Sequence, residues 1–181
     1  VDAGDLGLNR TTVTRYLALF ESVFLIKTLP AWSGGGAHRA IGTPKLAFVD
    51  TGLLCHLLGQ GQARLADPGG AAGPVLENFV LMELARQLTW NDERATLWHY
   101  RTKDKVEVDA VIEAADGRIV GIEVKAGATL NKQDFAGLRH LRDRLGDRFV
   151  AGFALYTGQH SLAFGDRLRA LPIDALWRVV P

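Results

Sequence analysis

The segment from Val106 to Lys125 carries the residues whose types and spacing are best suited to chemistry. Its dipeptide Asp116-Gly117 predicts a β-hairpin turn. A two-residue turn would mix charged and apolar side chains on both faces of the ribbon, whereas a three-residue loop over residues 115–117 separates them. With glycine as the left-handed residue of that loop, Asp109 pairs with Glu123 across the hairpin. The sequence therefore predicts two carboxylates side by side.

Because side chains alternate between the two faces of a strand, the same register sorts the hairpin into an apolar face and a charged face. The apolar face is expected to hold Val106, Val108, Ala110, Ile112, Val120, Ile122, Val124 and Ala126. The other face is expected to hold Glu107, Asp109, Glu123 and Lys125. Opposed carboxylates destabilise a sheet by up to about 1 kcal/mol, and Mg²⁺ would offset that repulsion because it prefers oxygen ligands. The alternative is a solvated polar face on which Glu107 and Lys125 form an ordinary ion pair.

A third acid, Glu77, is expected on a helix. Pro74 suits the first turn of that helix, and residues 75–88 carry apolar side chains at helical spacing. Glu77 falls in line with these apolar residues, where an unpaired carboxylate is costly and tends to protonate or to find a cation. The alternative is a carboxylate at the margin of the apolar stripe, paired to an arginine.

An acid on a helix, an Asp on a strand and Glu-x-Lys on the next strand resemble the PD-(D/E)XK nuclease superfamily. The matching positions are Glu77, Asp109 and Glu123-Val124-Lys125. Longer blocks are similar to a prokaryotic family, the C-terminal domain of unknown function attached to predicted AAA-type P-loop ATPases. These blocks are Asn9 to Glu21, Pro44 to Leu54, Leu76 to Val80, and Tyr100 to Asp109.

The resemblance implies a restriction-endonuclease-like α/β fold and metal-assisted hydrolysis of nucleic-acid phosphodiester bonds. In such a site Asp109 and Glu123 hold Mg²⁺ or Mn²⁺, and Lys125 positions the attacking water or helps to deprotonate it. Glu77 completes the ligand set or binds a second ion. The alternative is the same fold retained as a non-catalytic module, which binds DNA or a protein and regulates an upstream ATPase.

The elements around the hairpin are expected to build a mixed sheet flanked by helices. An amphipathic helix is predicted from Asn131 to Leu145, a buried strand from Phe149 to Tyr156, and a final edge strand from Ala175 to Val179. With the helix of Glu77 and the strands of the hairpin, the order becomes helix, three strands, helix, strand. That order is the expected core of a restriction-endonuclease-like fold.

Residues 1–60 are expected to form a small winged-helix-like N-terminal part. Asn9 is the predicted cap of a helix that begins at Arg10, and Asp50 is predicted to cap a second helix rather than to bind a metal. Residues 61–73, rich in Gly and Ala, indicate a linker, and the nuclease-like domain is expected over residues 74–181.

The chain is not strongly basic, because 21 Lys and Arg stand against 20 Asp and Glu, for a formal net charge of +1. Affinity for nucleic acid, which we expect to be DNA, must therefore come from local groups. Arg101, Lys103 and Lys105 are candidates for contacts to its backbone. Arg10 and Arg15 could present the first helix to DNA, although a solvated or protein-facing helix is the alternative.

The sequence lacks two kinds of pattern, those of membrane or secreted proteins and that of P-loop ATPases. No run of eighteen apolar residues and no signal-peptide pattern occurs, so we expect a cytoplasmic protein with no membrane partner. No G-x-x-x-x-G-K-[ST] motif occurs, so this chain is not expected to hydrolyse ATP. Because the sequence begins at Val1 without a methionine, we expect a piece of a longer protein with its ATPase part upstream.

Overall fold

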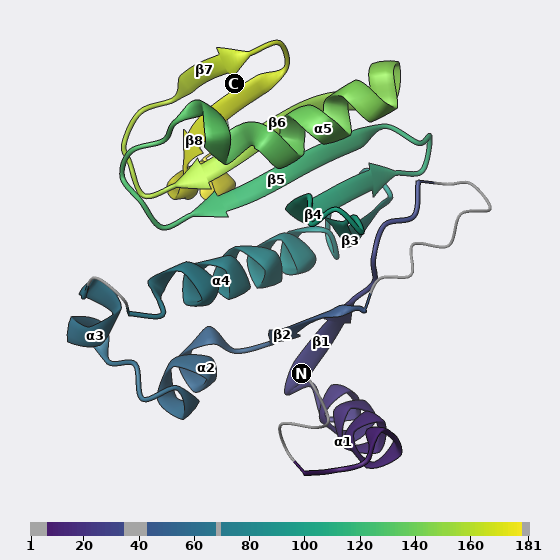
Figure 1. The fold of residues 1–181 in the computed structure, drawn as a ribbon, viewed down its shortest axis with the longest axis vertical. Helices are drawn as coiled ribbons and strands as arrows, with labels where there is room; N and C mark the ends of the chain where they lie inside the picture. The colour runs from purple at the N-terminus through teal and green to yellow at the C-terminus, as the bar shows by residue number, and fades with distance from the viewer. Residues whose placement is uncertain (1–6, 35–42, 68–69, 179–181) are drawn as a thin grey trace.

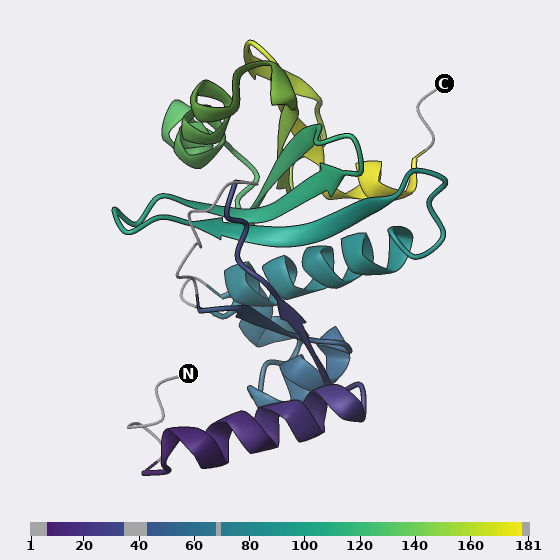
Figure 2. The same ribbon diagram turned by 90° about the vertical axis from the view of Figure 1, so that its right-hand side faces the viewer.

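A six-stranded mixed sheet forms the centre of the computed structural model, which describes residues 7–34, 43–67 and 70–178. The strands lie in the order β3 (Ala95–Arg101), β4 (Glu107–Ala114), β5 (Ile119–Lys125), β6 (Phe149–Tyr156), β8 (Leu168–Pro172) and β7 (Leu162–Gly165). Helix α4 (Ala72–Gln87) covers one face and α5 (Ala136–Leu145) covers the other (Figures 1 and 2). The predicted mixed α/β architecture is confirmed at this level.

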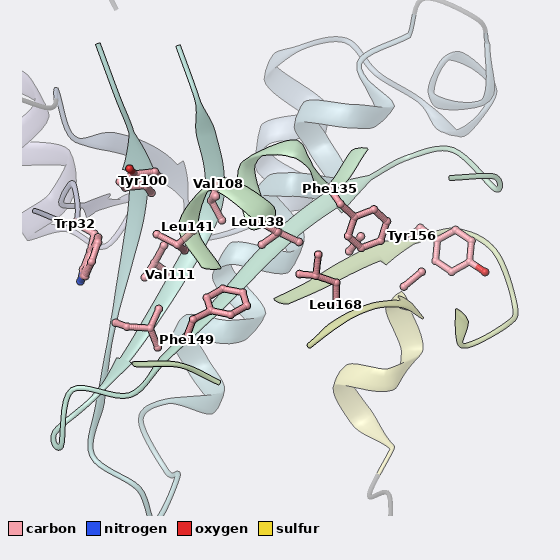
Figure 3. Close-up of a cluster of buried hydrophobic side chains, with 13 residues drawn as sticks. Trp32, Tyr100, Val108, Val111, Phe135, Leu138, Leu141, Phe149, Tyr156 and Leu168 are labelled. Carbon is pink, nitrogen blue, oxygen red and sulfur yellow. The ribbon is translucent and has the colours of Figure 1, made fainter. Parts of the chain in front are cut away.

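Both faces of the sheet are buried by apolar side chains. The cluster drawn in Figure 3 lies on the α5 side and includes Val108, Val111, Leu138, Leu141 and Phe149. The cluster on the α4 side includes Val80, Leu81, Leu84, Ala110 and Ile122. The central strand β5 is therefore apolar along most of its length, as expected of a strand that is covered on both faces.

The hairpin of β4 and β5 has the predicted register. Ala110 pairs with Ile122 and Glu113 pairs with Ile119, which leaves a loop of three residues between Ala114 and Arg118. Gly117 has a φ of +87°, the left-handed conformation that such a loop requires. After α5, strand β6 adds in parallel to β5, so the predicted order of helix, three strands, helix and strand is also confirmed.

The predicted alternation of side chains fails near the start of β4, because a bulge interrupts the strand. Trp98 pairs with Val111 but Tyr100 pairs with Val108, so Asp109 and Ala110 together lie opposite the single residue His99. A bulge of this kind re-aims the side chains that precede it. Val108 and Val106 consequently pack in the cluster on the α5 side, not on the face of Ala110 where the sequence placed them.

The C-terminal end differs from the prediction. Residues Ile173–Trp177 form the 3₁₀ helix η4, so the predicted edge strand from Ala175 is wrong, and its last residue, Val179, lies outside the described residues. The sheet instead ends in β8 and β7, an antiparallel pair that the sequence analysis missed. These strands are only 5 and 4 residues long, which leaves too few positions for an alternating pattern to be recognised.

The N-terminal part consists of α1 (Arg10–Ser22), the antiparallel pair β1 (Ile26–Leu29) and β2 (Lys45–Phe48), and the helices α2 (Thr51–Leu57) and α3 (Gln62–Ala66). Asn9 caps α1 by accepting from Thr12 N at 2.8 Å, and Asp50 caps α2 by accepting from Leu53 N at 2.6 Å, as predicted. Helix α3 lies inside the segment 61–73 that was expected to be a linker. No helix in the described part of the chain is long and apolar enough to cross a lipid bilayer.

Strand β2 is attached to α4 by the side chain of Asn78. Asn78 Oδ1 accepts from Phe48 N at 2.7 Å, while its Nδ2 donates to Phe48 O and to Thr51 Oγ1, each at 3.0 Å. Asn78 therefore pairs with both backbone groups of Phe48, as a neighbouring strand would. This contact fixes the position of β2, and with it Lys45, relative to α4.

We predict that Asn78→Ala lowers the free energy of unfolding by about 2 kcal/mol, because it leaves partly buried backbone groups without partners. Chemical denaturation measures this change. The exposed Asn91, which donates to Glu93 O at 3.3 Å, provides a matched control whose replacement by Ala should shift the value by less than about 0.5 kcal/mol. Equal stability of the two variants would contradict the role given to Asn78.

Candidate carboxylate and lysine site

The acidic residues singled out by the sequence come together at one end of the sheet. Asp109 lies near the start of β4, and Glu123 lies near the end of β5, which is the antiparallel neighbour of β4. Glu77 approaches from α4. Lys125 is the last residue of β5 and lies on the same side of that strand as Glu123.

Lys45 of β2 belongs to this site, although the sequence analysis did not single it out. Its Nζ lies 2.5 Å from Glu77 Oε1 and 3.5 Å from Asp109 Oδ1. Among the described residues, the partner of Glu77 is therefore a lysine from a distant strand and not the arginine of the alternative interpretation. Lys45 and Glu77 are 32 residues apart in the sequence, so no local spacing could have revealed the pair.

Asp109 takes its position from the bulge in β4. Its Oδ2 accepts from Val124 N at 2.9 Å, so one carboxylate oxygen binds the backbone of β5 and the other faces Lys45. The expectation that Asp109 and Glu123 project from one flat face is corrected accordingly. Asp109 contacts Lys45, which also binds Glu77 of α4, whereas Glu123 Oε1 lies beside Gly137 of α5. The negative charge of Asp109 nevertheless acts on Glu123.

Glu123 is buried, with only 7% of its surface exposed. Its Oε2 lies 3.3 Å from Lys125 Nζ. Its Oε1 lies 2.8 Å from the point where a Cβ on Gly137 would be, and that same point is 2.0 Å from Glu107 O. Only glycine fits at position 137, and its absence of a side chain lets the first turn of α5 close over Glu123.

Burial and neighbouring charges shift the proton affinities of these groups. Burial, reinforced by the negative charge of Asp109 and opposed by Lys125, raises the pKa of Glu123 to about 8. Burial and the charge of Asp109 likewise raise the pKa of Glu77, against the opposing effect of Lys45. Burial lowers the pKa of Lys45, but the charges of Asp109 and Glu77 outweigh it and raise that pKa overall. The site therefore combines a carboxyl group of raised pKa, Glu123, with an ion-paired Lys45.

His99 of β3 lies opposite the bulge and is buried, with 4% of its surface exposed. Burial and the nearby charge of Lys45 lower the pKa of His99, so its imidazole is neutral at pH 7. Within the described residues, its Nε2 makes no hydrogen bond. No sequence pattern indicated His99, because its place beside Lys45 depends on how β2 packs on α4 and on the bridge that joins Ala31 to His99.

The donor chemistry of the site suits a cation. The carboxylates of Glu77 and Asp109 already share one, the Lys45 ammonium, and oxygen ligands of this kind also suit Mg²⁺ and Mn²⁺. Across residues 7–34, 43–67 and 70–178, however, no three His, Cys, Asp or Glu side chains are arranged closely enough to form a preassembled metal site. In this arrangement Lys45 pairs with Glu77 and Asp109, and Lys125 pairs with Glu123.

The basic residues predicted to contact nucleic acid divide into two groups. Arg101, Lys103 and Lys105 lie at and beside the turn between β3 and β4, at the end of the sheet where β4 begins and where Asp109 lies. Arg101 pairs with Glu107 at 2.8 Å, and all three side chains are exposed. Arg10 and Arg15 are exposed on α1, which packs beside β1 and lies away from the large sheet (Figure 2). The structure does not bring these last two to the site.

Comparison with known proteins places the chain among relatives that have no assigned activity. Residues 72–176 match the family described as Domain of unknown function (DUF4143), and residues 3–64 match Domain of unknown function (DUF8612). The uncharacterized proteins Mb2031c of Mycobacterium bovis and Rv2008c of Mycobacterium tuberculosis are each 31% identical over 175 residues. The match covers 96% of this chain but only 37% of each relative.

We predict that Glu123 makes the free energy of unfolding depend on pH. A carboxyl group with a raised pKa binds more protons in the folded than in the unfolded protein between its two pKa values, here 4.5 and about 8. The free energy of unfolding therefore falls as pH rises through this window, by at most about 1.4 kcal/mol per pH unit. Glu123→Gln should reduce that slope, and the part that remains is expected from Glu77, whose pKa is also raised. Chemical denaturation across the window measures both.

Glu93→Gln is the matched control, because Glu93 is exposed and pairs with Arg118 far along the hairpin. Its pH profile should follow that of the wild type. Parallel profiles for Glu123→Gln and the wild type would show that Glu123 has an ordinary pKa.

Proposed function

The chain belongs to the DUF4143 family, and from this premise we propose that it is a metal-dependent, nuclease-like domain that hydrolyses phosphodiester bonds in nucleic acid. The observation that carries the proposal is the convergence of Glu77, Asp109 and the Glu123-Val124-Lys125 triplet from a helix and two adjacent strands at one end of a mixed sheet. Together with the order of helix, three strands, helix and strand, this supports a restriction-endonuclease-like core of the PD-(D/E)XK type.

Each residue of the site has a distinct part in this proposal. Asp109 and Glu123 would hold Mg²⁺ or Mn²⁺, and Glu77 would complete the ligand set. An ion held there would supply Lewis-acid chemistry, that is, charge neutralisation and activation of water. Lys125, whose Nζ lies 3.3 Å from Glu123 Oε2, orients the attacking water beside that carboxylate. Burial of Glu123 under α5 keeps solvent from this side of the site.

The turn between β3 and β4 is the proposed contact to the backbone of the nucleic acid, which we take to be DNA. Arg101, Lys103 and Lys105 are exposed there, and phosphate contacts of this kind position a substrate without reading its sequence. Arg10 and Arg15 of α1 are proposed as a separate contact, in keeping with a winged-helix-like role for the N-terminal part. Their distance from the site means that they would bind a different stretch of DNA.

The surrounding protein is also part of the proposal. The chain spans 37% of the length of its mycobacterial relatives, which leaves room in proteins of that size for another domain. We assign that place to an upstream AAA-type P-loop ATPase, in a cytoplasmic protein.

The second candidate function is a binding module without catalysis, which regulates the ATPase through DNA or a protein. One observation favours it specifically: Lys45 already pairs with Glu77 and Asp109, so these acids are satisfied without a metal. In that case the acids and lysines stabilise the end of the sheet, and the exposed basic residues account for binding.

We predict that the protein cleaves DNA or RNA in the presence of Mg²⁺ or Mn²⁺ and that Lys125→Ala lowers the rate by about 100-fold or more, because the water loses its orienting group. Affinity for the nucleic acid should change little, since phosphate contacts are spread over many basic residues. Lys132→Ala, which removes an exposed lysine of η2 (Lys132–Phe135), should leave both properties unchanged.

Cleavage and binding titrations run in parallel decide between the two functions. A wild-type protein that binds nucleic acid but remains inert with each metal and substrate, also when joined to its ATPase part, would overturn the nuclease proposal and favour the binding module.

A further prediction concerns the turn between β3 and β4. Replacing Arg101, Lys103 and Lys105 together by Ala should weaken binding to all sequences alike and should reduce the slope of log affinity against log salt by about one for each lost phosphate contact. Fluorescence anisotropy at several salt concentrations measures both. The control is Lys132→Ala, which removes an exposed lysine that is not assigned to the contact and should leave the affinity and the salt slope unchanged. An unchanged slope for the triple variant would contradict the contact at the turn.

A further inference from the structure

We propose that the Lys45 ammonium occupies the place of a cation between Glu77 and Asp109, so that a divalent ion can bind there only by displacing Lys45. This inference rests on the proposed metal-dependent function. It adds that the affinity for the ion is limited by a residue from the N-terminal part of the chain, which the family resemblance does not place in the site.

The geometry of Lys45 is that of a bridging cation. Its Nζ is 2.5 Å from Glu77 Oε1 and 3.5 Å from Asp109 Oδ1, and these carboxylates belong to two different elements. The side chains of Lys45, Glu77 and Asp109 are 26%, 29% and 14% exposed, so the pairs are shielded from bulk water more than ordinary surface ion pairs. An incoming ion must therefore replace an interaction that is not negligible.

Lys45 can leave without disturbing the fold. Asn78 fixes the backbone of β2 to α4 at Phe48, three residues along the strand from Lys45. The ammonium, in contrast, is attached through a flexible four-carbon chain with many rotamers. Displacement is thus a movement of one side chain, and the carboxylates stay in position to receive the ion.

Lys125 does not share this role. Its Nζ contacts Glu123 Oε2, and among the described residues no ion pair joins it to Glu77 or to Asp109. Of the two lysines, only Lys45 stands between the carboxylates that would have to share an ion. The two lysines are therefore expected to behave differently when replaced.

The test is a titration with Mn²⁺ alone, in which free Mn²⁺ is measured by electron paramagnetic resonance. Lys45→Met removes the charge but keeps a long, flexible side chain, and it should tighten Mn²⁺ binding by about tenfold, which corresponds to about 1.4 kcal/mol. Lys27→Met is the matched control, because Lys27 is exposed on β1, beside β2, and pairs with Ala47 rather than with an acid of the site. Its affinity for Mn²⁺ should equal that of the wild type.

Lys45→Arg, which keeps the positive charge, should retain the weak affinity of the wild type. An affinity of Lys45→Met that equals or falls below that of the wild type overturns the inference while leaving the metal site itself in place. If neither protein binds Mn²⁺, both the inference and the proposed metal-dependent function fail. These two failures are distinguished by the wild-type titration.

A second measurement requires no variant and therefore does not depend on whether Lys45→Met folds. The ¹³Cε signal of Lys45 in the wild-type protein should shift when Mg²⁺ is added, with the same midpoint as ion binding. A signal that stays in place while the ion binds would overturn displacement.

Discussion

Repulsion among the carboxylates of Glu77, Asp109 and Glu123 is the constraint on which the arrangement of this site depends. Three acids from one helix and two strands come together at the end of the sheet, where partial burial makes unpaired charge costly. Different groups offset different parts of that cost. Lys45 pairs with Glu77 and Asp109, Lys125 pairs with Glu123, and the backbone N–H of Val124 donates to Asp109. The raised pKa of Glu123 means that this carboxyl group takes up a proton more readily, which also relieves the repulsion.

Three features of the fold hold the residues of this cluster in position: the bulge in β4, the glycine at position 137 and the contact of Asn78 with β2. The bulge in β4 turns Asp109 toward Lys45 of β2, away from the regular alternation of the strand. Glycine at position 137 lets α5 close over Glu123, and Asn78 keeps β2 against α4. The N-terminal part is thereby joined to the chemistry of the large sheet through Lys45. A metal ion at this place would replace the Lys45 ammonium and would favour the deprotonated form of Glu123. Its binding would therefore be coupled to proton release.

Local features of the fold could be predicted from the sequence because they depend on neighbouring residues. The three-residue loop at Gly117 set the register of β4 and β5, and Asn9 and Asp50 were recognisable as helix caps. Features that depend on distant partners could not be predicted. The bulge at Asp109 is visible only in the pairing of β4 with β3, and Lys45 meets Glu77 only after β2 docks on α4. The short strands β7 and β8 were missed because so few residues show no period.

The central claim is that these carboxylates bind a divalent ion. It is tested most directly by crystals grown with Mn²⁺ and measured at the manganese absorption edge. We predict an anomalous peak within coordination distance of Asp109 and of at least one of Glu77 and Glu123, with the Lys45 ammonium moved away from Asp109. A fully occupied Lys45 side chain between Glu77 and Asp109, with no anomalous peak at high Mn²⁺ concentration, would contradict the account.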